Sequence, residues 1–108
     1  MNKLNNTNAV NGTSFHNVTI VATPQELFDI LGEPACDDNG GRDKVNFEWW
    51  LETADGKAVT LYDWKEYRRI RMNEEIEWHI GGHSFIDTAD AKDELQYLLD
   101  SCRIYSEV

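Results

Sequence analysis

Alternation of apolar and polar residues predicts three β-strands in the middle of the chain. Within residues 45–51 every second side chain is apolar, and the residues between them are polar except for Trp50. Residues 58–65 and 75–80 continue this alternation, and an Asp-Gly pair typical of hairpin turns separates the first two segments. The pattern predicts an antiparallel sheet with one buried face and one face of aromatic and charged residues.

Two helices are predicted from a different spacing. A short helix begins after Thr23, where Pro24 and Glu26 are typical of a capping box, and it ends at Gly32. A second helix over about residues 88–101 has one apolar face, formed by Ala91, Leu95, Leu98, Leu99 and Cys102. We therefore expect an α+β fold: a three- to four-stranded, mainly antiparallel sheet with a C-terminal helix and a short N-terminal helix packed on one face.

Residues 1–17 are predicted to form a flexible tail. They include six asparagines and too few apolar side chains to offset the entropy lost on ordering. The β-branched run 18–21 that follows is interpreted as an edge strand. We expect a single domain over residues 18–108.

The chain is strongly acidic, with a formal net charge of -10 from 20 acidic and 10 basic residues. Such a charge repels phosphates and anionic lipids, which argues against nucleic acid as a partner, and it favours a basic protein surface. The alternative is that the acidic residues only keep the protein soluble. Neither an apolar leader nor a stretch of transmembrane length is seen, so we expect a cytoplasmic protein with no membrane contact and reduced cysteines.

Basic residues concentrate in one segment. Four of the ten lie within residues 65–71, namely Lys65, Arg68, Arg69 and Arg71, and Trp64 and Tyr67 lie among them. Arginines with aromatic side chains are typical of sites for phosphate or single-stranded nucleic acid. The alternative, which we favour given the net charge, is that the arginines pair with Glu74, Glu75 and Glu77 across the neighbouring strand.

The motif His79-Ile80-Gly81-Gly82-His83 places two histidines four residues apart. On a helix this spacing would put two metal ligands on one face, but the two glycines indicate a turn between a strand and a helix, so we expect no metal. A diglycine turn also allows the backbone to approach an anion closely. The alternative is that the turn only connects the strand to the following helix.

No serine or cysteine lies in a recognisable nucleophile motif. Asp63 occupies an inward position of the middle strand, where a buried carboxylate needs a partner such as Lys65, Arg68 or a tyrosine hydroxyl. Because no second acid or nucleophile accompanies it, we interpret Asp63 as structural; a hydrolase that uses Asp63, His79 and His83 is the third hypothesis. We expect no catalytic residues, no enzyme activity and no cofactor.

Three segments carry a resemblance to known proteins. The runs Leu61-Tyr62-Asp63-Trp64-Lys65 and Trp78-His79-Ile80-Gly81-Gly82, with the segment Glu26–Pro34, resemble a pattern in small, uncharacterised proteins of bacteriophages and prophages. The resemblance covers roughly residues 23–100 and brings no activity with it. It implies a viral protein in the cytoplasm of an infected bacterium, where small acidic proteins serve as inhibitors of host or defence enzymes.

The leading hypothesis is a non-catalytic binding protein that occupies a basic or aromatic-lined surface of a host or defence protein. Large aromatic side chains on the outward face support this hypothesis, because such side chains indicate a binding face, a homodimer interface or a stacking platform. The alternative is that the tail or the loop at 35–43 covers them. The alternative is a nucleotide-binding module that uses the aromatic and arginine residues with the diglycine turn. The candidate residues are Trp50, Tyr62, Trp64, Tyr67, Arg68, Arg69, Arg71, His79, Gly81, Gly82 and His83.

Overall fold

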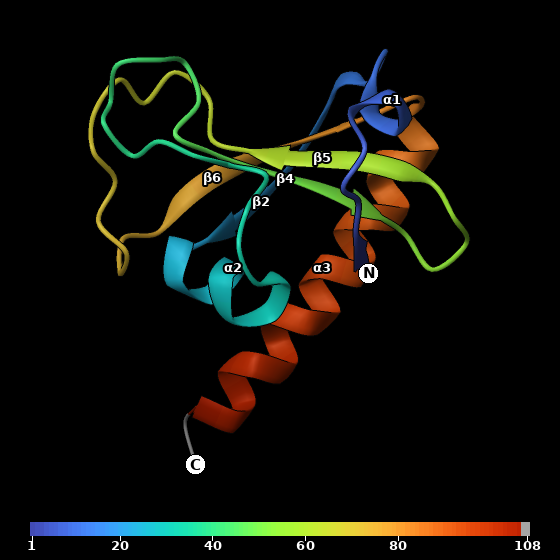
Figure 1. Cartoon of the computed structure of the whole chain (residues 1–108). Helices are drawn as coiled ribbons and strands as arrows, with labels where there is room; N and C mark the ends of the chain where they lie inside the picture. The colour runs from blue at the N-terminus through green and yellow to red at the C-terminus, as the bar shows by residue number, and fades with distance from the viewer. Residues whose placement is uncertain (107–108) are drawn as a thin grey trace.

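The computed structural model describes residues 1–106 and contains one antiparallel sheet of six strands (Figure 1). The strand order is β1-β4-β5-β6-β2, and β3 also pairs with β4, nearer the beginning of that strand. The α+β class is confirmed, but three to four strands was too few, because β1 and β3 have two residues each and leave no alternation to detect. The strands are β1 (Asn2–Lys3), β2 (Ser14–Ala22), β3 (Cys36–Asp37), β4 (Phe47–Glu52), β5 (Ala58–Tyr62) and β6 (Ile76–Gly82).

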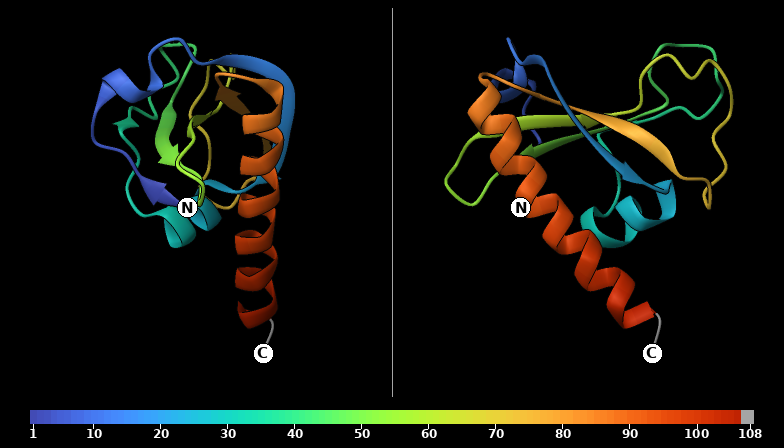
Figure 2. Two further views of the ribbon diagram at one scale, coloured as in Figure 1. Left: turned by 90° about the vertical axis from the view of Figure 1, so that its right-hand side faces the viewer. Right: turned by 180° about the vertical axis from the view of Figure 1, so that it is seen from behind.

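Two helices, α2 (Pro24–Leu31) and α3 (Phe85–Ser106), pack on the same face of the sheet, as predicted (Figures 1 and 2). The capping box at Thr23 is present: the backbone N–H of Glu26 donates to Thr23 Oγ1 at 3.1 Å, and that of Thr23 donates to the Glu26 carboxylate at 2.9 Å. The α3 helix starts before residue 88 because Ser84 Oγ accepts from the backbone N–H of Asp87 at 3.2 Å. Within residues 1–106 none of the helices combines the length and apolar character needed to span a membrane.

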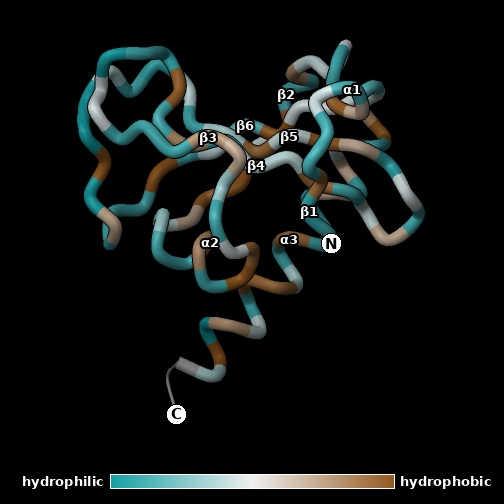
Figure 3. The backbone as a smooth tube through the Cα atoms, in the orientation of Figure 1, coloured by the Kyte–Doolittle hydropathy of each residue, from teal (hydrophilic) through white to brown (hydrophobic). Residues whose placement is uncertain are grey.

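Two tryptophans form the centre of the core between the sheet and the helices. Trp49 of β4 and Trp78 of β6 are fully buried, and their ring centroids lie 5.8 Å apart in an edge-to-face arrangement. The indole N–H of Trp49 donates to Gly32 O at 3.0 Å, and that of Trp78 donates to Ala22 O at 2.9 Å. Both side chains therefore add hydrophobic stabilisation without leaving a buried donor unpaired. Figure 3 shows the hydrophobic segments that the strands and helices contribute to this core.

Residues 1–17, predicted to be a flexible tail, contain secondary structure. The β1 strand pairs with the end of β4, and the backbone N–H of Leu4 donates to Trp50 O at 2.8 Å. A one-turn helix, α1 (Thr7–Val10), follows, and β2 begins at Ser14 as the strand at the opposite edge of the sheet. The segment thus connects the two edges of the sheet. Backbone pairing and an Asn6 cap on α1 hold it, and these contacts need few apolar side chains.

The Gly81-Gly82 pair does not form a turn, so this prediction was wrong. Both residues are buried in β6, which continues past Ile80. A Cβ at Gly81 would lie 2.5 Å from Thr60 Oγ1, and one at Gly82 would lie 2.8 Å from Thr88 Cγ2. These glycines allow close packing of β6 against β5 and α3.

Candidate binding face

The face of the sheet away from α2 and α3 is open over its middle. The α1 helix and its flanking residues cross one end of this outer face, and the loops 38–46 and 63–75 rise at the other end (Figure 1). Figure 2 shows α1 and α3 on opposite sides of the sheet. Between α1 and the two loops lies a cluster of four rings, which we term the aromatic patch; it consists of Phe15, Tyr62, Trp64 and His79.

Three rings of the aromatic patch, those of Phe15, Tyr62 and Trp64, all contact the His79 imidazole. The Phe15 ring stacks on the His79 imidazole with centroids 4.0 Å apart and an interplanar angle of 12°. The Trp64 ring lies 6.3 Å from the same imidazole at 29°, and the edge of Tyr62 meets Trp64 at 6.0 Å and His79 at 5.6 Å. Phe15 and Trp64 are 37% and 39% exposed, so the patch offers aromatic surface to a partner while its inner ring, His79, is half-buried.

Strand pairing places these rings side by side. Tyr62 of β5 lies opposite His79 of β6, and Phe15 of β2 lies opposite Gly81. A Cβ at Gly81 would lie 3.6 Å from Tyr62 Cε1, so the missing side chain leaves room for the rings above β6. Gly81 was expected in a turn, with the approach of an anion as one hypothesis, and instead it supports the aromatic patch from within the strand.

Strained backbone borders the aromatic patch. Among residues 1–106 the non-glycine residues with positive φ are Asn17 at 65°, Lys65 at 56° and Tyr67 at 51°. Asn17 lies where the register of β2 shifts between Phe15 and Thr19, and Lys65 directly follows Trp64. Asparagine adopts this left-handed conformation readily, but it costs an ordinary residue such as Lys65 or Tyr67 roughly 1–2 kcal/mol, and such strain gathers at functional sites. The segment that follows Trp64 is therefore held in a conformation that the chain does not adopt freely.

Side chains of the loop 38–46 bind the backbone of the loop 63–75. Asn39 accepts from the backbone N–H of Ile70 at 2.7 Å and donates to Ile70 O at 2.7 Å. Asn46 Nδ2 donates to Arg68 O at 2.7 Å and to Asn39 Oδ1 at 3.0 Å. Gly41 packs directly on the backbone of Arg68, where a Cβ would lie 2.6 Å from Arg68 Cα. The two loops form one unit, and Trp64 lies at its base.

Asp63 is fully buried and stabilises this base. One carboxylate oxygen, Oδ1, accepts from the backbone N–H groups of Asn46 and Phe47, both at 2.8 Å, and Oδ2 accepts from that of Asn46 at 3.1 Å. The predicted partners Lys65, Arg68 and a tyrosine hydroxyl were wrong, because the backbone of Asn46 and of Phe47, the first residue of β4, supplies the donors. Burial raises the pKa of the Asp63 carboxyl, and these hydrogen bonds oppose the shift.

The three residues of the hydrolase hypothesis do not come together. The Asp63 carboxylate is fully buried against the backbone of residues 46 and 47, and the His79 ring lies in the aromatic patch on the outer face. His83 follows β6, and its Nε2 contacts Ala9 O at 3.2 Å. Within residues 1–106 no three His, Cys, Asp or Glu side chains are grouped to hold a metal ion, and both cysteines are free thiols.

The arginines of the basic segment turn away from the aromatic patch. Both terminal nitrogens of Arg68 contact the Glu74 carboxylate, at 2.8 and 2.7 Å, and Arg71 Nε lies 4.0 Å from the same carboxylate. Pairing with Glu74 is confirmed, but it occurs within the loop 63–75 rather than across strands. Arg69 and Arg71 line a groove of about 540 Å³ with Phe28, which packs against the core. Tyr67 is exposed in the same loop.

Charged groups of both signs surround the aromatic patch. Lys44 Nζ and Lys65 Nζ lie 5.8 and 5.5 Å from the centroid of Trp64, within the range of cation–π attraction. Glu48 lies opposite Tyr62, and Glu77 lies two residues before His79 on β6. Burial lowers the pKa of the His79 imidazole, with Glu77 opposing the shift, so the ring is neutral at pH 7. Burial and then the charge of Glu48 raise the pKa of the Tyr62 hydroxyl.

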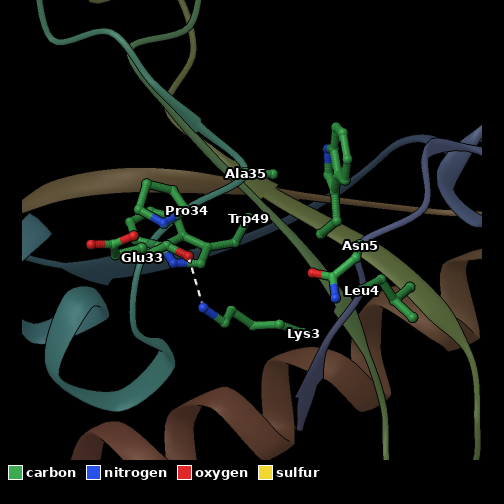
Figure 4. A pocket seen from close by; sticks show the side chains of 8 residues that line it. Lys3, Leu4, Asn5, Glu33, Pro34, Ala35 and Trp49 are labelled. Atoms are coloured by element: carbon green, nitrogen blue, oxygen red, sulfur yellow. Dashed lines mark hydrogen bonds between the residues drawn. The ribbon is translucent and has the colours of Figure 1, made fainter.

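Trp50 lies outside the aromatic patch and is half-buried beside β1. Its indole N–H donates to the Glu48 carboxylate at 2.6 Å, and it lines a pocket of about 300 Å³ between β1 and the connection from α2 to β3. Figure 4 shows this pocket, in which Lys3 Nζ donates to Glu33 O at 3.2 Å. The N-terminal segment therefore covers Trp50 in part, as one alternative predicted, and leaves Trp64 open.

The sequence patterns did not indicate four residues that the structure places in or beside the site: Phe15, Asn39, Lys44 and Asn46. Phe15 lies in the asparagine-rich segment that composition assigned to a tail, although it is the only phenylalanine there.

Comparison of the chain with protein-family models, with curated proteins and with solved structures gave no match. The function therefore has to be inferred from the geometry of the chain itself.

Proposed function

We propose that this protein is a non-catalytic binding protein that attaches through the aromatic patch to a basic surface of a host or defence protein and blocks that surface. The observation that carries the proposal is the contiguous set of Phe15, Tyr62, Trp64 and His79 on the open side of the sheet, opposite the side that α2 and α3 cover. Aromatic side chains are enriched in the energetically important centres of protein interfaces.

The rigidity of the aromatic patch supports this function. Ring contacts through His79, the strained Lys65 beside Trp64, and the joined loops 38–46 and 63–75 fix the rings before a partner arrives. A preorganised surface binds more tightly because less conformational entropy is lost on association. Truncating one aromatic anchor of an interface costs about 2 kcal/mol, or about thirtyfold in Kd.

The charge distribution favours a basic partner. The net charge of -10 steers association with a positively charged surface, and Glu48 and Glu77 lie beside the rings. Lys44 and Lys65 already lie over Trp64, so a cation of the partner is expected to bind nearer to the carboxylates than to the indole. Inhibition of a bacterial defence protein is the role that the resemblance to phage proteins implies.

The nucleotide-binding alternative has less support. It requires the diglycine turn, whereas Gly81 and Gly82 are buried in β6. It also requires free arginines beside Trp64, whereas Arg68 is paired with Glu74 and Arg71 lines a groove with Phe28. What still favours it is the pair of lysines that lie over Trp64.

The experiment compares capture by the wild-type chain, Trp64→Ala and Phe85→Ala in a bacterial lysate. Phe85 is an exposed aromatic residue outside the aromatic patch, so it controls for loss of apolar surface in general. A captured protein is then purified, and its Kd is measured for each variant at low and high salt. The proposal expects about thirtyfold weaker binding for Trp64→Ala, no change for Phe85→Ala and weaker binding at high salt. Heat released on titration with nucleotides and abolished by Trp64→Ala would instead support the alternative.

A further inference from the structure

The solvent side of α3 carries a regular series of apolar and acidic residues. Ile86, Tyr97 and Ile104 are 68%, 73% and 64% exposed, and Asp90, Asp93 and Asp100 are exposed between them. These six positions follow one another in alternating steps of four and three residues, which is the spacing that keeps side chains on one line of a helix. We term these six residues the α3 stripe.

The fold does not require the apolar members of the α3 stripe. Ala91, Leu95 and Leu99 already pack α3 against the sheet, and they are fully buried. Tyr97 lies two residues after Leu95, about 200° around the helix axis, so it faces away from the core. Figure 3 shows that hydrophobic positions continue into the last turns of α3, where Figure 2 shows the helix projecting beyond the sheet.

The α3 stripe is held in place and borders a hollow. Arg103 Nε donates to the Glu26 carboxylate at 2.6 Å, which anchors the end of α3 to the start of α2. Beside Tyr97 lies a hollow of about 350 Å³ lined by Met1, Asp93, Glu94, Tyr97 and Leu98. An apolar side chain from outside can enter this hollow between acidic groups.

Charge determines what fits this surface. If two α3 stripes met face to face, the aspartates of one helix would lie against those of the other in either orientation, and like charges at that distance repel. A second copy of this chain is therefore a poor occupant. A helix with its own apolar seam flanked by lysine or arginine would bury Ile86, Tyr97 and Ile104 and neutralise the three aspartates.

We propose that the α3 stripe is a second docking surface, which binds a basic amphipathic helix of a partner protein. The α3 helix and the aromatic patch lie on opposite sides of the sheet, so the two surfaces can be occupied at the same time (Figure 2). The inference rests on α3 alone and does not depend on the function proposed for the aromatic patch.

The test uses a synthetic three-heptad peptide with leucine at the seam and lysine beside it, a scrambled peptide of the same composition, and a glutamate version. Each is titrated calorimetrically against the full chain, Tyr97→Ala/Ile104→Ala, Asp93→Asn/Asp100→Asn and Phe85→Ala. Phe85 is 59% exposed on the same helix and lies about 100° from the stripe, which makes it the matched control. All replaced side chains are exposed, so the circular dichroism spectrum is expected to stay unchanged.

The proposal expects the lysine peptide to bind, the scrambled and glutamate peptides to bind at least about tenfold more weakly, and both double variants to lose about tenfold or more in affinity. Phe85→Ala is expected to bind like the wild type. Equal binding of the scrambled peptide, or an equal loss in Phe85→Ala, would overturn the proposal. A wild-type dimer that Tyr97→Ala/Ile104→Ala converts to monomer would overturn it as well, because the occupant would then be a second copy.

Discussion

Two glycines offer a matched pair of substitutions that tests whether the loops 38–46 and 63–75 form one unit. Gly41 has φ of 75° and Gly56 has φ of 86°, so alanine is forced into a left-handed conformation at both positions. At Gly41 the new Cβ would lie 2.6, 2.7 and 2.9 Å from backbone atoms of Arg68, and at Gly56 it would have no neighbour within 4 Å. The two variants therefore share the conformational cost and differ in the steric one.

The expected magnitudes follow from these surroundings. The left-handed conformation costs about 1 kcal/mol net, since alanine also restricts the unfolded chain. Gly41→Ala must in addition separate the loop backbones, which weakens the two hydrogen bonds between Asn39 and Ile70 and the one from Asn46 to Arg68. Each is worth about 1 kcal/mol. We expect the free energy of unfolding to fall by about 1 kcal/mol in Gly56→Ala and by about 4 kcal/mol in Gly41→Ala.

Urea unfolding followed by tryptophan fluorescence measures both values, provided that the dependence on urea concentration stays the same in the two variants. A loss in Gly41→Ala within about 0.5 kcal/mol of that in Gly56→Ala would refute the account of the loops, because that difference is no larger than the effect of an ordinary surface substitution.

Three further substitutions test other parts of the structure. Asp63→Ala should lower the free energy of unfolding by about 2–3 kcal/mol, because it leaves two buried backbone N–H groups unpaired; an unchanged melting temperature would contradict this. The pKa of the His79 imidazole is lowered in the folded chain, so as pH falls the unfolded chain is protonated at this residue before the folded chain is. The free energy of unfolding should therefore fall as pH drops through about 6.5, and His79→Phe should lessen that fall between pH 7 and 5. The hydrogen bond from Arg103 lowers the pKa of the Glu26 carboxyl. The pair should therefore stabilise the fold above the ordinary carboxyl pKa and lose this effect as pH falls through the lowered pKa. Glu26→Gln should remove that part of the acid sensitivity, which thermal melts from pH 7 to 3 measure.

Sequence patterns predicted those helices and strands that are formed by interactions within one short segment. The period of two over residues 45–51 became β4, the capping box at Thr23 started α2, and the apolar stripe of residues 91–99 became the buried side of α3. In each case the physical cause lies within one turn or one strand, so a short window of sequence contains it.

Contacts between distant segments were not predictable in this way. Asn39 meets Ile70 across 31 residues, and Asp63 meets the backbone of Asn46 across 17. In these hydrogen bonds a side chain pairs with a backbone group, so the identity of the residue that supplies the backbone group does not indicate the contact. Phe15 joined the aromatic patch because β2 extends into a segment that composition alone assigned to a tail.

Site-specific photo-cross-linking in bacterial cells tests the proposed binding face most directly. A photoreactive phenylalanine at Thr19, which lies opposite His79 on the outer face, leaves all four rings of the aromatic patch intact, and one at the exposed Lys57 in the turn between β4 and β5 serves as the control. If the aromatic patch is the binding face, position 19 gives a protein adduct that is lost when Trp64→Ala is added, and position 57 gives no such adduct. The absence of an adduct at position 19, or an adduct that persists in Trp64→Ala, would contradict that assignment.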